Sequence, residues 1–98
     1  MRVGFLPDFW IDVVEAAEWL DEQRPGLGRE FVAAVDASID KVLENPRAYR
    51  AVDAPTRRFI IKRFRHLVFY EAEADNVLFL GVVHGSRDVN RWLEHRRG

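Results

Sequence analysis

One change in hydrophobic spacing constrains this chain more than any other feature. Apolar residues recur at helical intervals over 9–23 and again over 27–42, and the second pattern stops at Asn45-Pro46. From Arg57 onward, the apolar residues are mostly β-branched or aromatic and have the spacing of strands. A chain whose helices come first and whose strands follow is typical of the α+β class.

The expected order of elements follows from the breaks in these patterns. A short connection at 24–28 joins the two helices, so they should form an antiparallel hairpin. Before them, Pro7 ends a first strand, and Asp8 is placed to begin the first helix. Asp88 can cap a short final helix from Val89. Strands are expected at 2–6, 57–63, 67–73 and 77–83, with a loop over 47–56 and a turn near Arg65-His66.

We therefore expect a βααβββ fold with a short C-terminal helix. The helical hairpin should lie on one face of a small, mainly antiparallel sheet. Residues 77–83 are apolar throughout, which predicts a central strand covered on both faces. Trp92 and Leu93 of the final helix are expected to return to the core.

Composition narrows the class of protein. A length of 98 residues predicts one domain over 1–98, and 48% hydrophobic residues with three Trp exclude a disordered chain. No run of about 18 apolar residues and no signal-peptide pattern are present, so we expect a cytoplasmic protein that does not enter the membrane. Without cysteine, with three separated His and no Gly-rich phosphate loop, we expect neither a metal nor a cofactor.

The net charge of −1 conceals a strong separation of charge. Before Arg57 the chain has six Lys and Arg residues against eleven Asp and Glu, and from Arg57 onward it has nine against five. Two polar clusters concentrate the positive charge, at 57–65 and at 84–88. Such asymmetry suits binding to nucleic acid or to an acidic protein segment, and charge alone favours neither.

The order of these elements resembles the RelE/ParE superfamily of toxins from type II toxin-antitoxin modules. The resemblance covers nearly the whole chain. It rests on Gln23–Gly28 followed by Phe31, Asn45-Pro46 followed by Tyr49, Arg57-Arg58, Ile61–Phe64, Val68–Tyr70, and Val82–Arg87 followed by Trp92. It implies a toxin that arrests growth, functions in plasmid stabilization, and is neutralised in a hetero-oligomer by a cognate antitoxin.

Two branches of the superfamily share this fold and differ in target. One cleaves messenger RNA on the ribosome, and the other inhibits DNA gyrase without nuclease chemistry. For the ribonuclease branch, the candidate catalytic residues are Lys62, Arg63, His84 and Arg87. The candidate target-binding residues are Arg58, Lys62, His84, Arg87, Arg91 and Trp92.

We favour the gyrase branch. Relatives that cleave messenger RNA usually have a Tyr or a His-Tyr pair near the C-terminus, where this chain offers Trp92 and His95. Strand alternation also places Arg58 and Lys62 on one face and Arg63 on the other, which divides the basic cluster. A third hypothesis is a non-toxic binding module that retains the antitoxin surface alone.

Structural roles are the alternatives to these functional roles. The basic strand can protect a solvated sheet edge, His84 can be a hydrogen-bonded residue, and Arg87 can pair with Asp88 or Glu94. The acidic side of the first helix, from Asp12 to Glu22, is expected to face solvent. Core or interface anchors are the simplest roles for Trp10, Trp19 and Trp92, and Phe9, Trp10 and Trp19 are candidates for an antitoxin interface.

Overall fold

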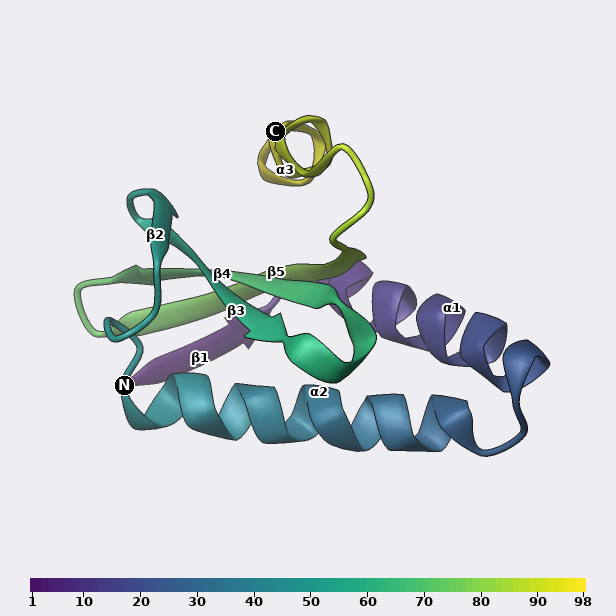
Figure 1. The fold of residues 1–98 in the computed structure, drawn as a ribbon. Helices are drawn as coiled ribbons and strands as arrows, with labels where there is room; N and C mark the ends of the chain where they lie inside the picture. Colours follow the sequence, from purple (N-terminus) through teal and green to yellow (C-terminus); the bar gives the residue numbers. More distant parts are fainter.

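A mixed five-stranded sheet with helices on both faces forms the architecture of the protein, seen here in a computed structural model that describes residues 1–98 (Figure 1). The elements are β1 (Arg2–Phe5), α1 (Pro7–Gln23), α2 (Leu27–Glu44), β2 (Ala51–Asp53), β3 (Thr56–Ile61), a 3-10 turn (Lys62–Phe64), β4 (His66–Glu73), β5 (Asn76–His84) and α3 (Val89–Arg97). The structure is α+β, as the spacing of apolar residues predicts.

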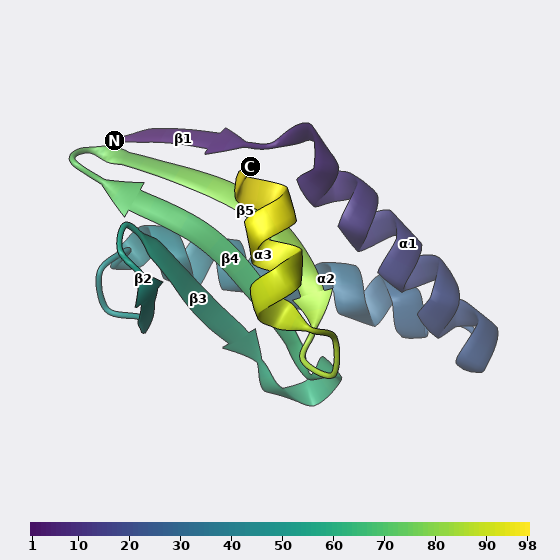
Figure 2. The ribbon, with the colours of Figure 1, turned by 90° about the horizontal axis from the view of Figure 1, so that it is seen from above.

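The strands lie in the order β1-β5-β4-β3-β2. β2 to β5 form an antiparallel meander, and β1 pairs with β5 in parallel, so that Arg2 lies opposite Asn76. Figure 2 shows this order from above, with α3 lying across the sheet. The parallel pair is possible because the helical hairpin and the meander separate the two strands in the sequence.

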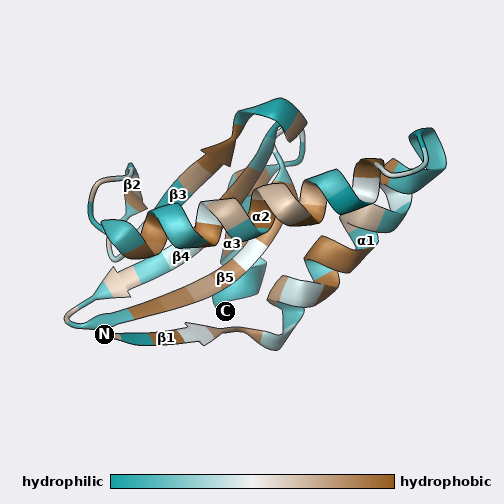
Figure 3. Ribbon diagram, turned by 90° about the horizontal axis from the view of Figure 1, so that it is seen from below, coloured by the Kyte–Doolittle hydropathy of each residue, from teal (hydrophilic) through white to brown (hydrophobic).

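Helices cover the sheet on two sides. α2 lies beneath it, α1 lies beside it at the end of β5, and α3 lies above it (Figures 1, 2 and 3). Phe79 of β5 packs with the larger cluster on the hairpin side, whereas Leu80 packs with Phe69 and Leu93 beneath α3. β5 is therefore an interior strand buried on both faces, and its continuous apolar sequence is explained.

Local sequence accounts for most helix boundaries. α1 begins at Pro7 rather than Asp8, because proline fits the first helical position and lacks the N–H that would have no partner there. Gly26, at φ 90°, precedes α2, and Asp88 caps α3 by accepting a hydrogen bond from the Arg91 amide at 3.2 Å. None of the helices is both long and apolar enough to span a membrane.

Two local predictions were wrong. The expected loop contains β2, a strand of three exposed residues whose sequence has no apolar alternation. The expected strand 57–63 ends at Ile61, because Lys62 and Arg63 enter the 3-10 turn and Arg65 closes it at φ 55°. Alternation along a strand therefore applies to Arg58 and Ile60, but it does not orient Lys62 or Arg63.

Position 56 provides a test of the packing. Thr56 is fully buried, and its hydroxyl has no hydrogen-bond partner. Removing such a group relieves a desolvation penalty, so Thr56→Val should raise the free energy of unfolding by about 1 kcal/mol. Urea denaturation measures the change. As a control, Thr56→Ala removes the buried methyl group too and should be the less stable of the two variants. Equal stability of the two would contradict the argument.

Candidate functional site

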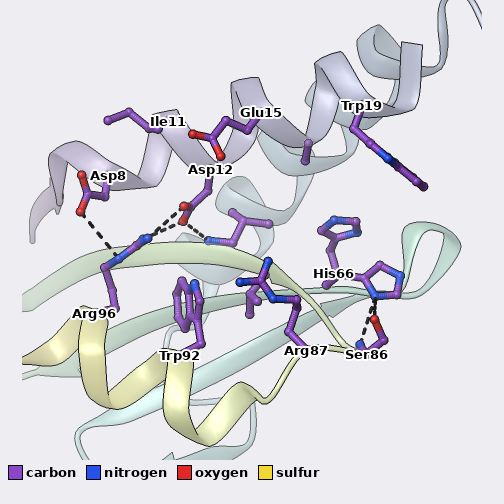
Figure 4. A pocket seen from close by; sticks show the side chains of 14 residues that line it. Asp8, Ile11, Asp12, Glu15, Trp19, His66, Ser86, Arg87, Trp92 and Arg96 are labelled. Carbon is purple, nitrogen blue, oxygen red and sulfur yellow. Dashed lines mark hydrogen bonds and ion pairs between the residues drawn. The ribbon is translucent and has the colours of Figure 1, made fainter. Parts of the chain in front are cut away.

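A hollow that we call the α1–α3 groove lies between α1, β5 and α3 and has a volume of about 630 Å³. Asp8, Asp12 and Glu15 line it from α1 (Figure 4). Arg87, Trp92 and Arg96 face them from the other side. His84, the last residue of β5, also lines the groove. The walls of the groove are thus acidic on one side and basic on the other.

An ion pair closes part of this groove. The Arg96 guanidinium donates to both carboxylate oxygens of Asp12, at 2.6 and 2.9 Å, and to the Leu80 carbonyl at 2.9 Å. The bond to Asp12 raises the pKa of Arg96. Asp12 also accepts the Val82 amide of β5 at 2.9 Å. The expectation that this carboxylate faces solvent was wrong, because α3 and β5 both use it as an acceptor.

The same guanidinium stacks on an aromatic ring. Its carbon lies 4.6 Å from the centre of the Trp92 ring, which in turn packs against Phe69 at 5.5 Å. Gly81 beneath them has no side chain, and a Cβ there would collide with Arg96, Asp12 and Trp92. A glycine at this position of β5 lets α3 approach the sheet closely.

His84 is held in one orientation at the end of the groove. Its Nδ1 accepts the Ser86 amide at 3.0 Å and lies 2.8 Å from the Ser86 hydroxyl. Beside it, His66 donates from Nδ1 to the Phe64 carbonyl at 2.7 Å, and the two imidazole rings lie 5.0 Å apart, edge to face. Burial lowers the pKa of His66. These contacts fix the orientation of both imidazole rings.

The candidate residues lie in separate places. His84, Arg87 and Trp92 line the α1–α3 groove, whereas Arg58 and Lys62 line a second hollow at the edge of β3. Arg63 forms an ion pair with Glu30 of α2. Arg91 is exposed on α3, and Arg87 forms no ion pair with Asp88 or Glu94.

The groove contains only part of the residue set that the ribonuclease hypothesis names. Cleavage needs a base, an acid and cationic stabilisation around one phosphate. Two of the four candidate groups, Lys62 and Arg63, lie outside the groove, while Asp8 and Glu15 add negative charge inside it. No group of three or more His, Asp or Glu side chains is placed so that it could hold a metal ion.

Sequence reasoning missed several residues of the two hollows. Asp12, Arg96 and His66 line the groove, and Arg50 joins Arg58 and Lys62 in the second hollow. Trp19 and Ile11 also line the groove and are 59% and 51% exposed, whereas Phe9 is fully buried and belongs to the core. A large apolar side chain as exposed as Trp19 indicates an interaction surface. Trp19 therefore remains a candidate for the antitoxin interface.

The fold has a known counterpart. A solved chain described as "Chromosomal ParDE TA system from P. aeruginosa" superposes with a TM-score of 0.65 at 12% identity, covering 86% of this chain and 95% of that one. Among curated proteins, no sequence matches this chain. Residues 3–89 match the family described as "ParE toxin of type II toxin-antitoxin system, parDE". The chain belongs to this ParE toxin family of type II toxin-antitoxin systems.

Removal of the Arg96 side chain tests the ion pair. Arg96→Leu leaves the Asp12 carboxylate, whose side chain is 15% exposed, without its cation. Loss of one partner of a fully buried ion pair lowers the free energy of unfolding by about 3–5 kcal/mol. Because this pair is partly exposed, we expect a decrease of roughly 2–3 kcal/mol, measured by urea denaturation. The matched control is Arg97→Leu, because its pair with Asp53 is more exposed and should contribute less than about 1 kcal/mol. Similar losses in both variants would contradict this assignment.

A pH dependence follows from His66. Because burial lowers its pKa below 6.5 in the folded protein, the unfolded chain binds more protons as the pH falls below 6.5. His66 therefore destabilises the fold on acidification, by at most about 1.4 kcal/mol per pH unit. His66→Asn replaces the ring N–H with an amide N–H donor that does not titrate. Between pH 7.5 and 5.5, the free energy of unfolding of this variant should therefore fall less than that of the wild type. Urea midpoints measure this, with the exposed His95→Asn as control. An unchanged pH dependence in His66→Asn would refute the prediction.

Proposed function

We propose that this ParE-family toxin arrests growth by binding DNA gyrase, without nuclease chemistry of its own, and that a cognate antitoxin neutralises it. The observation that carries the proposal is the charge arrangement of the α1–α3 groove. Arg96 is neutralised by Asp12, while Asp8 and Glu15 repel a polyanion. A protein surface with apolar groups and both signs of charge suits such a groove better than an RNA backbone does.

Residues on both walls support protein binding. Trp19 and Ile11 are exposed apolar side chains on α1, and Trp92 lies half-buried opposite them. Aromatic side chains beside an arginine are typical of the residues that dominate the energy of protein interfaces. Arg87, exposed and without an ion pair, is the cation that a partner can still engage.

The same groove is our candidate for the antitoxin surface. An amphipathic helix or an extended segment can place apolar side chains against Ile11 and Trp19 and an acidic residue near Arg87. An antitoxin bound in this way covers the residues that we assign to target binding. Neutralisation then follows from occlusion, in a toxin-antitoxin hetero-oligomer.

The target is tested by supercoiling of relaxed plasmid DNA with purified gyrase. The protein should inhibit the reaction, and Arg87→Gln should raise the half-inhibitory concentration about 10-fold, equivalent to about 1.4 kcal/mol of lost binding. Arg24→Gln is the matched control, because Arg24 pairs with Glu30, outside the groove. Unimpaired supercoiling at saturating protein would remove the gyrase proposal.

The two alternatives have tests of their own. A RelE-like ribosome-dependent endoribonuclease, with Lys62, Arg63, His84 and Arg87 as candidate catalytic residues, is favoured by the presence of His84 and Arg87 in one groove. It predicts cuts positioned at codons in transcripts mapped by primer extension after induction. Normal growth after induction in cells that lack the antitoxin would instead support a non-toxic binding module.

A further inference from the structure

The second hollow lies at the open edge of β3, away from the α1–α3 groove. It has a volume of about 310 Å³ and is lined by Tyr49, Arg50, Arg58, Phe59, Ile60 and Lys62. We call it the β3-edge hollow. It shares no residue with the α1–α3 groove.

Positive charge in this hollow is uncompensated. Arg50, Arg58 and Lys62 form no ion pair, and no carboxylate lines the hollow. The one acidic residue of β2, Asp53, pairs with Arg97 at 3.2 Å. Three free cations around one hollow attract an anion more strongly than the nearly neutral chain would as a whole.

A backbone donor lies among these cations. The Arg58 amide donates to the Arg50 carbonyl at 3.1 Å, away from β4, and the alternation of antiparallel pairing turns the Ile60 amide the same way. β2 pairs with Thr56 and Arg57 but does not extend as far as Ile60. The N–H of Ile60 therefore points to the open edge, and Ile60 lines the same hollow as Arg58 and Lys62.

The segment that supplies Arg50 is fixed in place. Arg57 donates to the Tyr49 carbonyl at 2.8 Å and to the Arg47 carbonyl at 3.3 Å. Tyr49 packs edge to face on Phe59, with ring centres 4.9 Å apart. The hollow is thus held by a strand and a tethered segment, which lowers the entropy cost of ordering its donors around a ligand.

We propose that the β3-edge hollow binds the phosphodiester backbone of duplex DNA. Guanidinium groups, an ammonium group and an outward backbone amide are the donors that proteins use for phosphate oxygens. The choice of DNA rests on the proposed function, since gyrase holds duplex DNA as its substrate. Contacts of this kind carry no sequence information, so binding is nonspecific and strongly dependent on salt.

Titration of the full-length protein into a fluorescently labelled 20-base-pair duplex, followed by anisotropy, tests the proposal. Each neutralised phosphate contributes about 0.9 to the salt slope, so three cations predict a slope of about −2.7 in log K against log [KCl]. Arg58→Gln should reduce this slope to about −1.8 and weaken binding equally for unrelated sequences. Arg63→Gln is the matched control: it removes the same charge one residue after Lys62 but lies outside the hollow.

Several outcomes would overturn the proposal. The first is the absence of DNA binding at the lowest salt concentration. The second is an equal loss of DNA affinity in Arg58→Gln and Arg63→Gln. The third is tighter binding of a glutamate-rich peptide than of DNA. The last result would identify the hollow as a site for an acidic protein. Circular dichroism spectra of both variants confirm that they remain folded.

The supercoiling assay separates this inference from the proposed function. Inhibition of gyrase by a protein that does not bind DNA would leave the gyrase proposal standing and remove the DNA site. Binding to DNA that depends on Arg58, without inhibition of gyrase, would support the DNA site and remove the gyrase proposal. In Arg58→Gln, inhibition of gyrase should weaken in parallel with the loss of DNA affinity.

Discussion

The carboxylate of Asp12 is the interaction on which the arrangement of the elements depends. It lies on α1, accepts the Val82 amide of β5, and binds the guanidinium of Arg96 on α3. One side chain therefore links the helical hairpin, the sheet and the final helix. Because a carboxylate with several hydrogen bonds can be desolvated at lower cost, the chain can place it, largely buried, in the wall of the groove.

The separation of charge in the sequence acquires a different meaning in three dimensions. Part of the acidic first half neutralises part of the basic second half, since Asp12 binds Arg96 and Glu30 binds Arg63. The cations at the edge of β3 have no such partner. A protein that is almost neutral overall thus has one groove with charges of both signs and one hollow whose charged residues are all positive. The two surfaces suit different classes of partner.

Local patterns in the sequence were sufficient for most of the fold and insufficient for the site. Apolar spacing predicts both long helices and the buried strand β5, and Asp88 is recognisable as a cap, because these features depend on nearby residues. β2 was missed because three exposed residues have no pattern. The pairing of Asp12 with Arg96 joins residues 84 positions apart, and Arg50 enters the β3-edge hollow through a loop. No local pattern contains such contacts.

The parallel pairing of β1 with β5 also affects how the chain folds. Arg2 pairs with Asn76, although most of the sequence separates the two residues. In contrast, β3, β4 and β5 pair through short connections. Closing a long loop costs entropy before its contacts stabilise the chain, so we expect the meander to form first and β1 to dock late. Until then the outer edge of β5 is open to other strands.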